Sequence, residues 1–180
     1  MEQMGVADLE RRLGSDRLDV RLGAIDALER IMIDSARDHP AIVELLAAFI
    51  RECTPAAAGP DLDTGGQPEP RPPADSQAAL TVLARRPAGR TERGPVNLAC
   101  ARLAGANLSR ANLTHADLGC ANLTRATLVH SNLTLVNLIL ADLTGADLAG
   151  ADLTEASLDS ADLPGVTLTH QQRSVILTAG

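Results

Sequence analysis

Cysteine and histidine side chains are the first candidates for chemistry in this sequence, which contains three cysteines and four histidines. Cys100 and Cys120 stand twenty residues apart, and His115 lies between them. Thiols and imidazoles bind zinc when four such ligands converge, and two adjacent thiols can form a disulfide. Either chemistry depends on the element that positions these side chains.

The familiar sequence signatures of enzymes are missing. The chain contains no lysine, which removes both the P-loop lysine and Schiff-base chemistry, and it has no GxxxxGK or GxSxG motif. We therefore expect a protein that is not an enzyme, with no catalytic residues and no cofactor.

The charge and the aromatic content bear on nucleic acids and membranes. The formal net charge is −7 and Phe49 is the only aromatic residue, so the chain repels phosphates and offers no platform for stacking bases. The start "MEQMGVADLERRLG" has no apolar core behind a basic region, and the longest apolar run, "AIVELLAAFI", is interrupted by Glu44. We expect no direct nucleic-acid binding, no membrane segment and a cytoplasmic location.

A leucine occurs at every fifth position from Leu98 to Leu168 without a break. A step of five fits neither an α-helix nor a β-strand, so the chain must bend once per pentad. Alanine stands two residues before most of these leucines, as Ala141 does before Leu143, which gives each pentad a short strand-like side with two inward residues. Four such sides close a square coil, in which residues twenty apart lie in one column.

The stretches "ANLTHADLGCANLTR" and "ADLTGADLAGADLTE" resemble the A(D/N)LXX motif of the pentapeptide repeat family. This resemblance implies a mainly β fold, a right-handed quadrilateral β-helix (a pentapeptide repeat solenoid), with a small α-helical N-terminal region. The sequence differs from the family pattern in using leucine at every centre and never phenylalanine.

The first half of the chain has the pattern of α-helices. Apolar residues at spacings of three and four predict amphipathic helices over residues 16–34 and 40–52, and "DSQAALTVLARRP" predicts a short third helix. These segments resemble the HEAT-like helical leader of actinobacterial pentapeptide repeat proteins. The expected organisation is a helical leader at 1–53, a flexible Pro/Gly linker at 54–74, a short helix and connector at 75–95, the repeats at 96–170 and a C-terminal cap segment at 171–180.

In a coil of four pentads, Cys100 and Cys120 stack on one face at about 4.8 Å. That distance permits a disulfide between them, but we expect two reduced thiols in a reducing cytosol. His115 falls on a different side of the coil, and His130 and His170 also lie on outward corners. We therefore expect no metal site.

Four apolar residues occupy outward positions in three consecutive pentads and form a candidate interaction surface: Val129, Leu135, Ile139 and Leu140. Two interpretations remain open for this band. The helical leader could dock over it, or the band could bind a protein partner or a second copy in a homodimer.

The last two coils carry acids and no arginine, which makes a candidate acidic surface of Asp142, Asp147, Asp152, Glu155, Asp159 and Asp162. By resemblance, some pentapeptide repeat proteins are DNA mimics that bind DNA gyrase and protect this topoisomerase from its inhibitors, a route to antibiotic resistance. The repeats carry about one net negative charge per 4.5 Å of solenoid, whereas duplex DNA carries about one per 1.7 Å. The repeats therefore have less than half the charge density of the duplex that they would mimic.

Val175, Ile176 and Leu177 follow the last coil. An open coil end exposes strand edges and core leucines, so this segment is expected to fold over the end or to form a C-terminal dimer contact. Taken together, the patterns predict a non-catalytic protein–protein interaction module or scaffold with a protein partner of unknown identity. The alternative hypothesis is the DNA mimic that binds gyrase.

Overall fold

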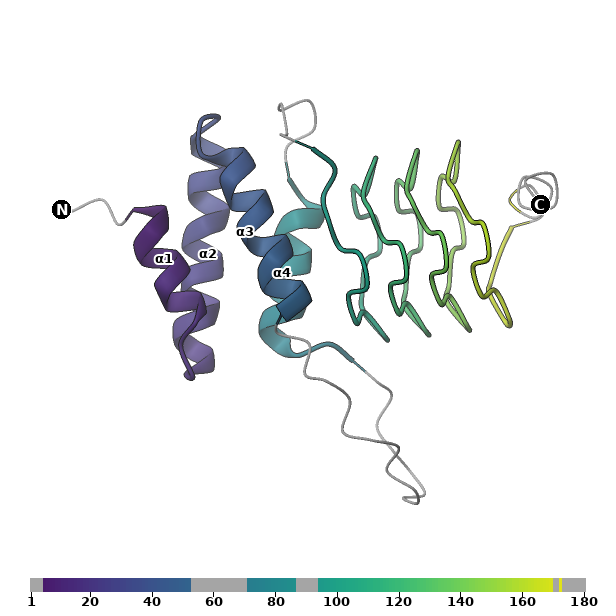
Figure 1. Cartoon of the computed structure of the whole chain (residues 1–180), viewed down its shortest axis with the longest axis horizontal. Coiled ribbons are helices and arrows are strands. Elements are labelled where there is room, and N and C mark those ends of the chain that lie inside the picture. The colour runs from purple at the N-terminus through teal and green to yellow at the C-terminus, as the bar shows by residue number, and fades with distance from the viewer. Residues whose placement is uncertain (1–4, 53–70, 87–93, 170–171, 173–180) are drawn as a thin grey trace, which may run out of the picture.

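The structure is a computed structural model that describes residues 5–52, 71–86, 94–169 and 172. Helices α1 to α4 form a layer at one end, and a stack of four-sided coils extends from α3 and α4 toward the C-terminus (Figure 1). Most of the expected linker, Cys53, His170 and the apolar residues Val175 to Leu177 lie outside the described residues.

The helical layer contains α1 (Val6–Leu13), α2 (Leu18–Asp34), α3 (His39–Glu52) and α4 (Ala74–Ala84). The helices predicted from apolar spacing correspond to α2, α3 and α4 and are confirmed. Apolar spacing does not predict α1, because this helix buries only Leu9 and Leu13 and is otherwise mostly charged. The HEAT-like character of the leader stays a prediction.

A buried ion pair joins two of these helices. Arg21 in α2 donates from Nε to the Asp75 carboxylate in α4 at 2.6 Å, and its Nη1 donates to the Ser15 carbonyl at 2.6 Å. The Asp75 side chain is almost fully buried, so its charge depends on Arg21 for compensation. Leu28, Leu46 and other buried apolar side chains fill the space between the helices.

The solenoid is held by parallel bridges between residues twenty apart, from Asn97 with Asp117 to Asp147 with Thr167. In the first pair, the Leu98 N–H donates to the Asp117 carbonyl at 2.8 Å, and the Asp117 N–H donates to the Val96 carbonyl at 2.9 Å. The predicted coil of four pentads is therefore confirmed. The solenoid contains less β-strand than the expected mainly β fold, because each side contributes one isolated bridge before the chain turns.

Each corner is a tight turn that ends in a left-handed residue. At the first corner the Ala101 N–H donates to the Leu98 carbonyl at 3.1 Å, and Cys100 has a φ of 56°. This conformation favours glycine, yet ten described corner residues that are not glycine adopt it. Leu135 and Leu140 are the two large apolar residues among them, with φ of 58° and 60°.

The interior of the coils is a column of buried leucine and alanine side chains, in which every repeat leucine from Leu98 to Leu153 is buried. Leu158, Leu163 and Leu168 in the last pentads are only partly buried. Gln172 lies over the end of this column, and its Nε2 donates to the carbonyls of Leu148 and Ala151 at 2.7 Å each. Gln172 is the part of the expected cap segment that the structure describes.

The helical layer covers the other end of the solenoid. The side chain of Gln77 in α4 pairs with the Asn107 backbone, donating to its carbonyl at 2.9 Å and accepting from its N–H at 3.0 Å. The Asn112 N–H donates to the Ala84 carbonyl at 3.0 Å, and Arg86 donates to the Asn112 carbonyl. These groups give the first coil the backbone partners that a preceding coil would supply.

This arrangement corrects one interpretation. The helical leader packs on the end of the solenoid and does not cover the band of Val129, Leu135, Ile139 and Leu140, of which the last three are exposed. The physical reason lies in the first coil, which has no preceding coil to pair its backbone groups or to cover its leucine column. The helices α3 and α4 pair these groups and cover the column.

Candidate interaction surface on the solenoid

Three of the four apolar residues expected on the surface lie around one side of the coils. Leu135 stands at the corner where this side begins, and Ile139 and Leu140 stand at the corner where it ends. Their exposed fractions are 40% for Leu135, 38% for Ile139 and 60% for Leu140. Val129 is half-buried at the corner before Leu135. We call the side between these two corners, through all four coils, the Leu140 side.

Small residues lie beneath Ile139 and Leu140 on the preceding coil. The Cys120 N–H donates to the Ile139 carbonyl at 2.9 Å, which places Gly119 and Cys120 directly below the two apolar side chains. Gly119 is buried, and a Cβ at that position would lie 3.1 Å from Asn137 Nδ2. The surface therefore steps from a low, small-residue region up to two projecting apolar side chains.

The middle of the Leu140 side is a polar column with paired side chains. Asn137 Nδ2 donates to Asp117 Oδ1 at 2.8 Å, linking two successive coils. Asp117 Oδ1 also accepts the Gly119 N–H at 3.0 Å, and Asn137 Oδ1 accepts the Ile139 N–H at 3.1 Å. These bonds hold the corner that carries Ile139 and Leu140, so the apolar side chains project from a fixed backbone.

Cys100 and Cys120 are exposed and stack at the same corner on the first two coils. A hydrogen bond with the Cys120 thiol is the main cause that raises the pKa of Cys100, and the nearby charge of Asp117 adds to it. The Cys100 thiol therefore stays protonated at neutral pH and is a poor nucleophile. Within the described residues, no three His, Cys, Asp or Glu side chains gather as metal ligands.

The six acids of the candidate acidic surface are spread over all four sides of the coils. Asp142 and Asp162 share one side, Asp152 and Glu155 share another, and Asp147 and Asp159 lie on the remaining two. Most of the aspartates accept bonds from their own turn. Asp152 Oδ1 accepts the Thr154 hydroxyl at 2.6 Å and its N–H at 3.0 Å, and these bonds lower the pKa of Asp152.

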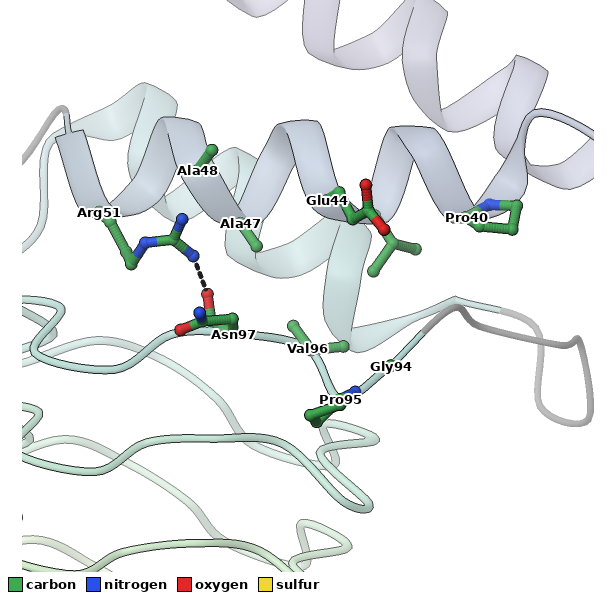
Figure 2. A pocket seen from close by; sticks show the side chains of 10 residues that line it. Pro40, Glu44, Ala47, Ala48, Arg51, Gly94, Pro95, Val96 and Asn97 are labelled. Atoms are coloured by element: carbon green, nitrogen blue, oxygen red, sulfur yellow. Dashed lines mark hydrogen bonds between the residues drawn. The ribbon is translucent and has the colours of Figure 1, made fainter.

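A cavity of about 390 Å³, not expected from the sequence, lies between α3 and the first coil. Figure 2 shows Glu44 and Arg51 on α3 facing Val96 and Asn97 on the coil, with Arg51 donating to the Asn97 carbonyl. Ala47 and Pro95 add apolar surface. No sequence pattern could locate this cavity, because it exists only where the helical layer meets the solenoid. The described residues of its lining supply one carboxylate and no imidazole or thiol, so they form no catalytic pair.

Over the part of the chain that the structure describes, none of the helices is both long enough and apolar enough to span a bilayer.

Comparison with known proteins concerns mainly the solenoid. Residues 97–134 and 131–169 match the family described as pentapeptide repeats, in eight copies. Rfr23, a pentapeptide repeat protein from the cyanobacterium Cyanothece 51142, is 32% identical to this chain over 47% of it and 67% of Rfr23, with a TM-score of 0.32. A search of the curated proteins found no match.

Two further solved structures are similar to parts of the chain. HetL, a pentapeptide repeat protein involved in heterocyst differentiation regulation in the cyanobacterium Nostoc sp. strain PCC 7120, is 32% identical over 46% of this chain and 43% of HetL, with a TM-score of 0.31. QnrB1, a plasmid-mediated fluoroquinolone resistance protein, is 19% identical over 46% of this chain and 62% of QnrB1, with a TM-score of 0.26. The chain thus spans less than half of HetL and less than two thirds of QnrB1. The family match and the unbroken leucine pentads agree, and this chain belongs to the pentapeptide repeat family.

Proposed function

We propose that this chain is a non-catalytic protein–protein interaction module. In this proposal, the right-handed quadrilateral β-helix of the family is the platform, and the Leu140 side is the binding surface. The observation that carries the proposal is the exposure of Leu135, Ile139 and Leu140 around one side of a rigid solenoid. Exposed apolar groups that gather on one side of a folded protein mark an interaction site more often than a chance cluster.

The backbone conformation strengthens this argument. Leu135 and Leu140 both have positive φ, a conformation that costs a residue other than glycine about 1–3 kcal/mol. Gly145 and Gly165 occupy the same corner position in other pentads, where this cost does not arise. The two leucines add this strain and expose apolar surface at the same time, and glycine would avoid both, which favours a role in binding.

The groups on this side also favour binding over catalysis. They include the three apolar side chains, the paired amide and carboxylate of Asn137 and Asp117, two thiols at one corner, and His115 and Glu155 at the other. Among these described groups, no nucleophile is paired with a base, and a raised pKa keeps Cys100 protonated. The flat side of a narrow solenoid also offers no enclosed volume for a small substrate.

An affinity pull-down tests the proposal. The bait is the full chain, compared with the triple variant Leu135→Arg, Ile139→Arg, Leu140→Arg, and the lysate is actinobacterial, following the resemblance of the helical leader. A matched control, Ser109→Arg, Thr144→Arg, Ala149→Arg, adds the same charge at the two corners away from the Leu140 side. We expect the wild type and the control to retain one protein that the triple variant loses.

The folded state of each variant is checked by circular dichroism. Equal retention of every captured protein by the wild type and the folded triple variant would show that the Leu140 side is not the binding surface. Recovery of DNA gyrase would identify the partner and support the alternative hypothesis. That alternative has less structural support, because the six acids lie on four different sides and no side carries more than two.

A further inference from the structure

We propose that the partner of the Leu140 side is the same side of a second copy of this chain, with the two solenoids antiparallel. This inference rests on the proposed function and names its partner. A two-fold axis would relate the two copies. This axis lies in the plane of the contact, perpendicular to both solenoids, and runs midway between the coil of Cys120 and the coil of Leu140. Such an axis places each column opposite the same column of the partner, with the order of the coils reversed.

The columns are fixed by the hydrogen bonds between coils. Bridges join Asn97, Asp117, Asn137 and Ser157 along the middle of the side. Backbone bonds from Cys100 to Gly119, from Cys120 to Ile139 and from Leu140 to Asp159 fix the corner column. Reversing the coil order about the proposed axis therefore determines which residues meet.

The resulting contacts are complementary in shape. Ile139 of each copy lies opposite Gly119 of the other, and Leu140 lies opposite Cys120, so projecting side chains meet the low region in two symmetric places. Leu135 lies close to the axis and meets Leu135 of the second copy. The three exposed apolar side chains of each copy are thus all covered by a single contact.

The polar groups are complementary in the same arrangement. In the middle column of the Leu140 side, reversal places Asn137 of one copy opposite Asp117 of the other. At the Leu135 corner, the stacked column of His115, Leu135 and Glu155 places His115 near Glu155 of the second copy. A parallel pair would instead bring Glu155 of one copy near Asp159 of the other, which is repulsive.

The size of the side limits the affinity. Four coils are about 19 Å tall at about 4.8 Å each, and a single side of a narrow coil is smaller than the roughly 800 Å² per partner of a standard interface. We therefore expect a dissociation constant in the micromolar range or weaker. The dimer should form at high protein concentration and dissociate on dilution.

Sedimentation equilibrium of the full chain, from about 1 µM to about 500 µM, spans the affinity expected for an interface of this size. The mass of the wild type should rise from that of the 18.8 kDa monomer toward twice that value. Leu140→Arg should remain monomeric, whereas Ser109→Arg, on a corner away from the interface, should behave as the wild type does.

A charge exchange separates specific pairing from nonspecific association. Glu155→Arg should weaken the dimer about tenfold, and adding His115→Glu to the same chain should restore it, because the two charges then attract again across the contact.

A symmetric cross-link tests the axis itself. With the native cysteines replaced by serine, Leu135→Cys should give a covalent dimer in oxidised glutathione, forming one S–S bond with release of two reduced glutathiones, whereas Ser109→Cys should not.

Two results would overturn the proposal. A wild-type chain that stays monomeric at the highest concentration excludes the second copy as partner. A dimer that survives Leu140→Arg, or that cross-links through Ser109→Cys, uses another surface. Neither result removes the proposed function, because retention of a different protein by the wild type and its loss from the triple variant would still place binding on the Leu140 side.

Discussion

At the scale of single residues, the direction in which each position of the pentad points determines what the Leu140 side presents. Leu135, Ile139 and Leu140 could be placed on the surface because a period of five assigns each position in the pentad a fixed direction. The period could not predict that Val129 would be half-buried, or that Asp117 would bond both Asn137 and Gly119. Such contacts depend on side-chain conformations, which spacing does not determine.

The corner conformation of Leu140 gives a prediction at this scale. Leu140→Gly should leave the free energy of unfolding unchanged or raise it by up to about 1 kcal/mol, because it relieves positive φ at an exposed position. Circular dichroism during thermal unfolding measures this effect, at a protein concentration low enough to exclude dimers. As a control, Ala149→Gly changes a described corner residue without positive φ and should lower stability by about 0.5–1 kcal/mol. A clear loss of stability in Leu140→Gly would mean that the leucine serves the fold.

At the scale of elements, apolar spacing identified α2, α3 and α4 but not what they pack against. A helical pattern shows which residues are buried and leaves the partner open. The decisive groups at the junction are polar: the Gln77 amide bonds both the N–H and the carbonyl of Asn107, as a peptide group of a neighbouring coil would. For this reason the sequence left open whether the helices cover the end or the band.

Gln77→Ala should lower the free energy of unfolding by about 1–2 kcal/mol, because it removes the partners of two backbone groups at the junction. Urea titration followed by circular dichroism measures the loss. Gln77→Glu is the informative companion, since a carboxylate still accepts from the Asn107 N–H but cannot donate to its carbonyl. If Gln77→Ala unfolds as the wild type does, the amide contributes nothing to the attachment of α4.

At the scale of the whole molecule, the pentad count determined the architecture of the solenoid before any contact was known. Among the residues that the structure describes, each coil is bridged only to the coils before and after it, apart from the helical layer at one end and Gln172 near the other. Stability in such a stack is a sum of neighbour contacts, so a coil in the middle has two and a coil at the end has fewer.

The same substitution at two heights tests this property. Leu123 and Leu163 lie on the same side, on the second and fourth coils, and only Leu123 is fully buried. Leu123→Ala should cost about 2–4 kcal/mol, and Leu163→Ala should cost less than half as much, because its site is partly open to water. Circular dichroism in urea measures both, since the chain has no tryptophan or tyrosine to report unfolding by fluorescence. Equal costs would contradict the view that the last coil is an open end.

The twenty-residue bridge spacing also constrains how this gene could change in length. Gain or loss of a whole coil between Cys120 and Leu140 would keep every later side chain on its original side and alter only the height of the solenoid. Gain or loss of a single pentad there would preserve the leucine column yet turn everything downstream by a quarter of a revolution. Ile139 would then no longer stand above Gly119, and the chain would still fold. The core therefore repeats every five residues, whereas the surface repeats every twenty. A tandem duplication of one pentad can destroy the recognition surface while leaving stability intact.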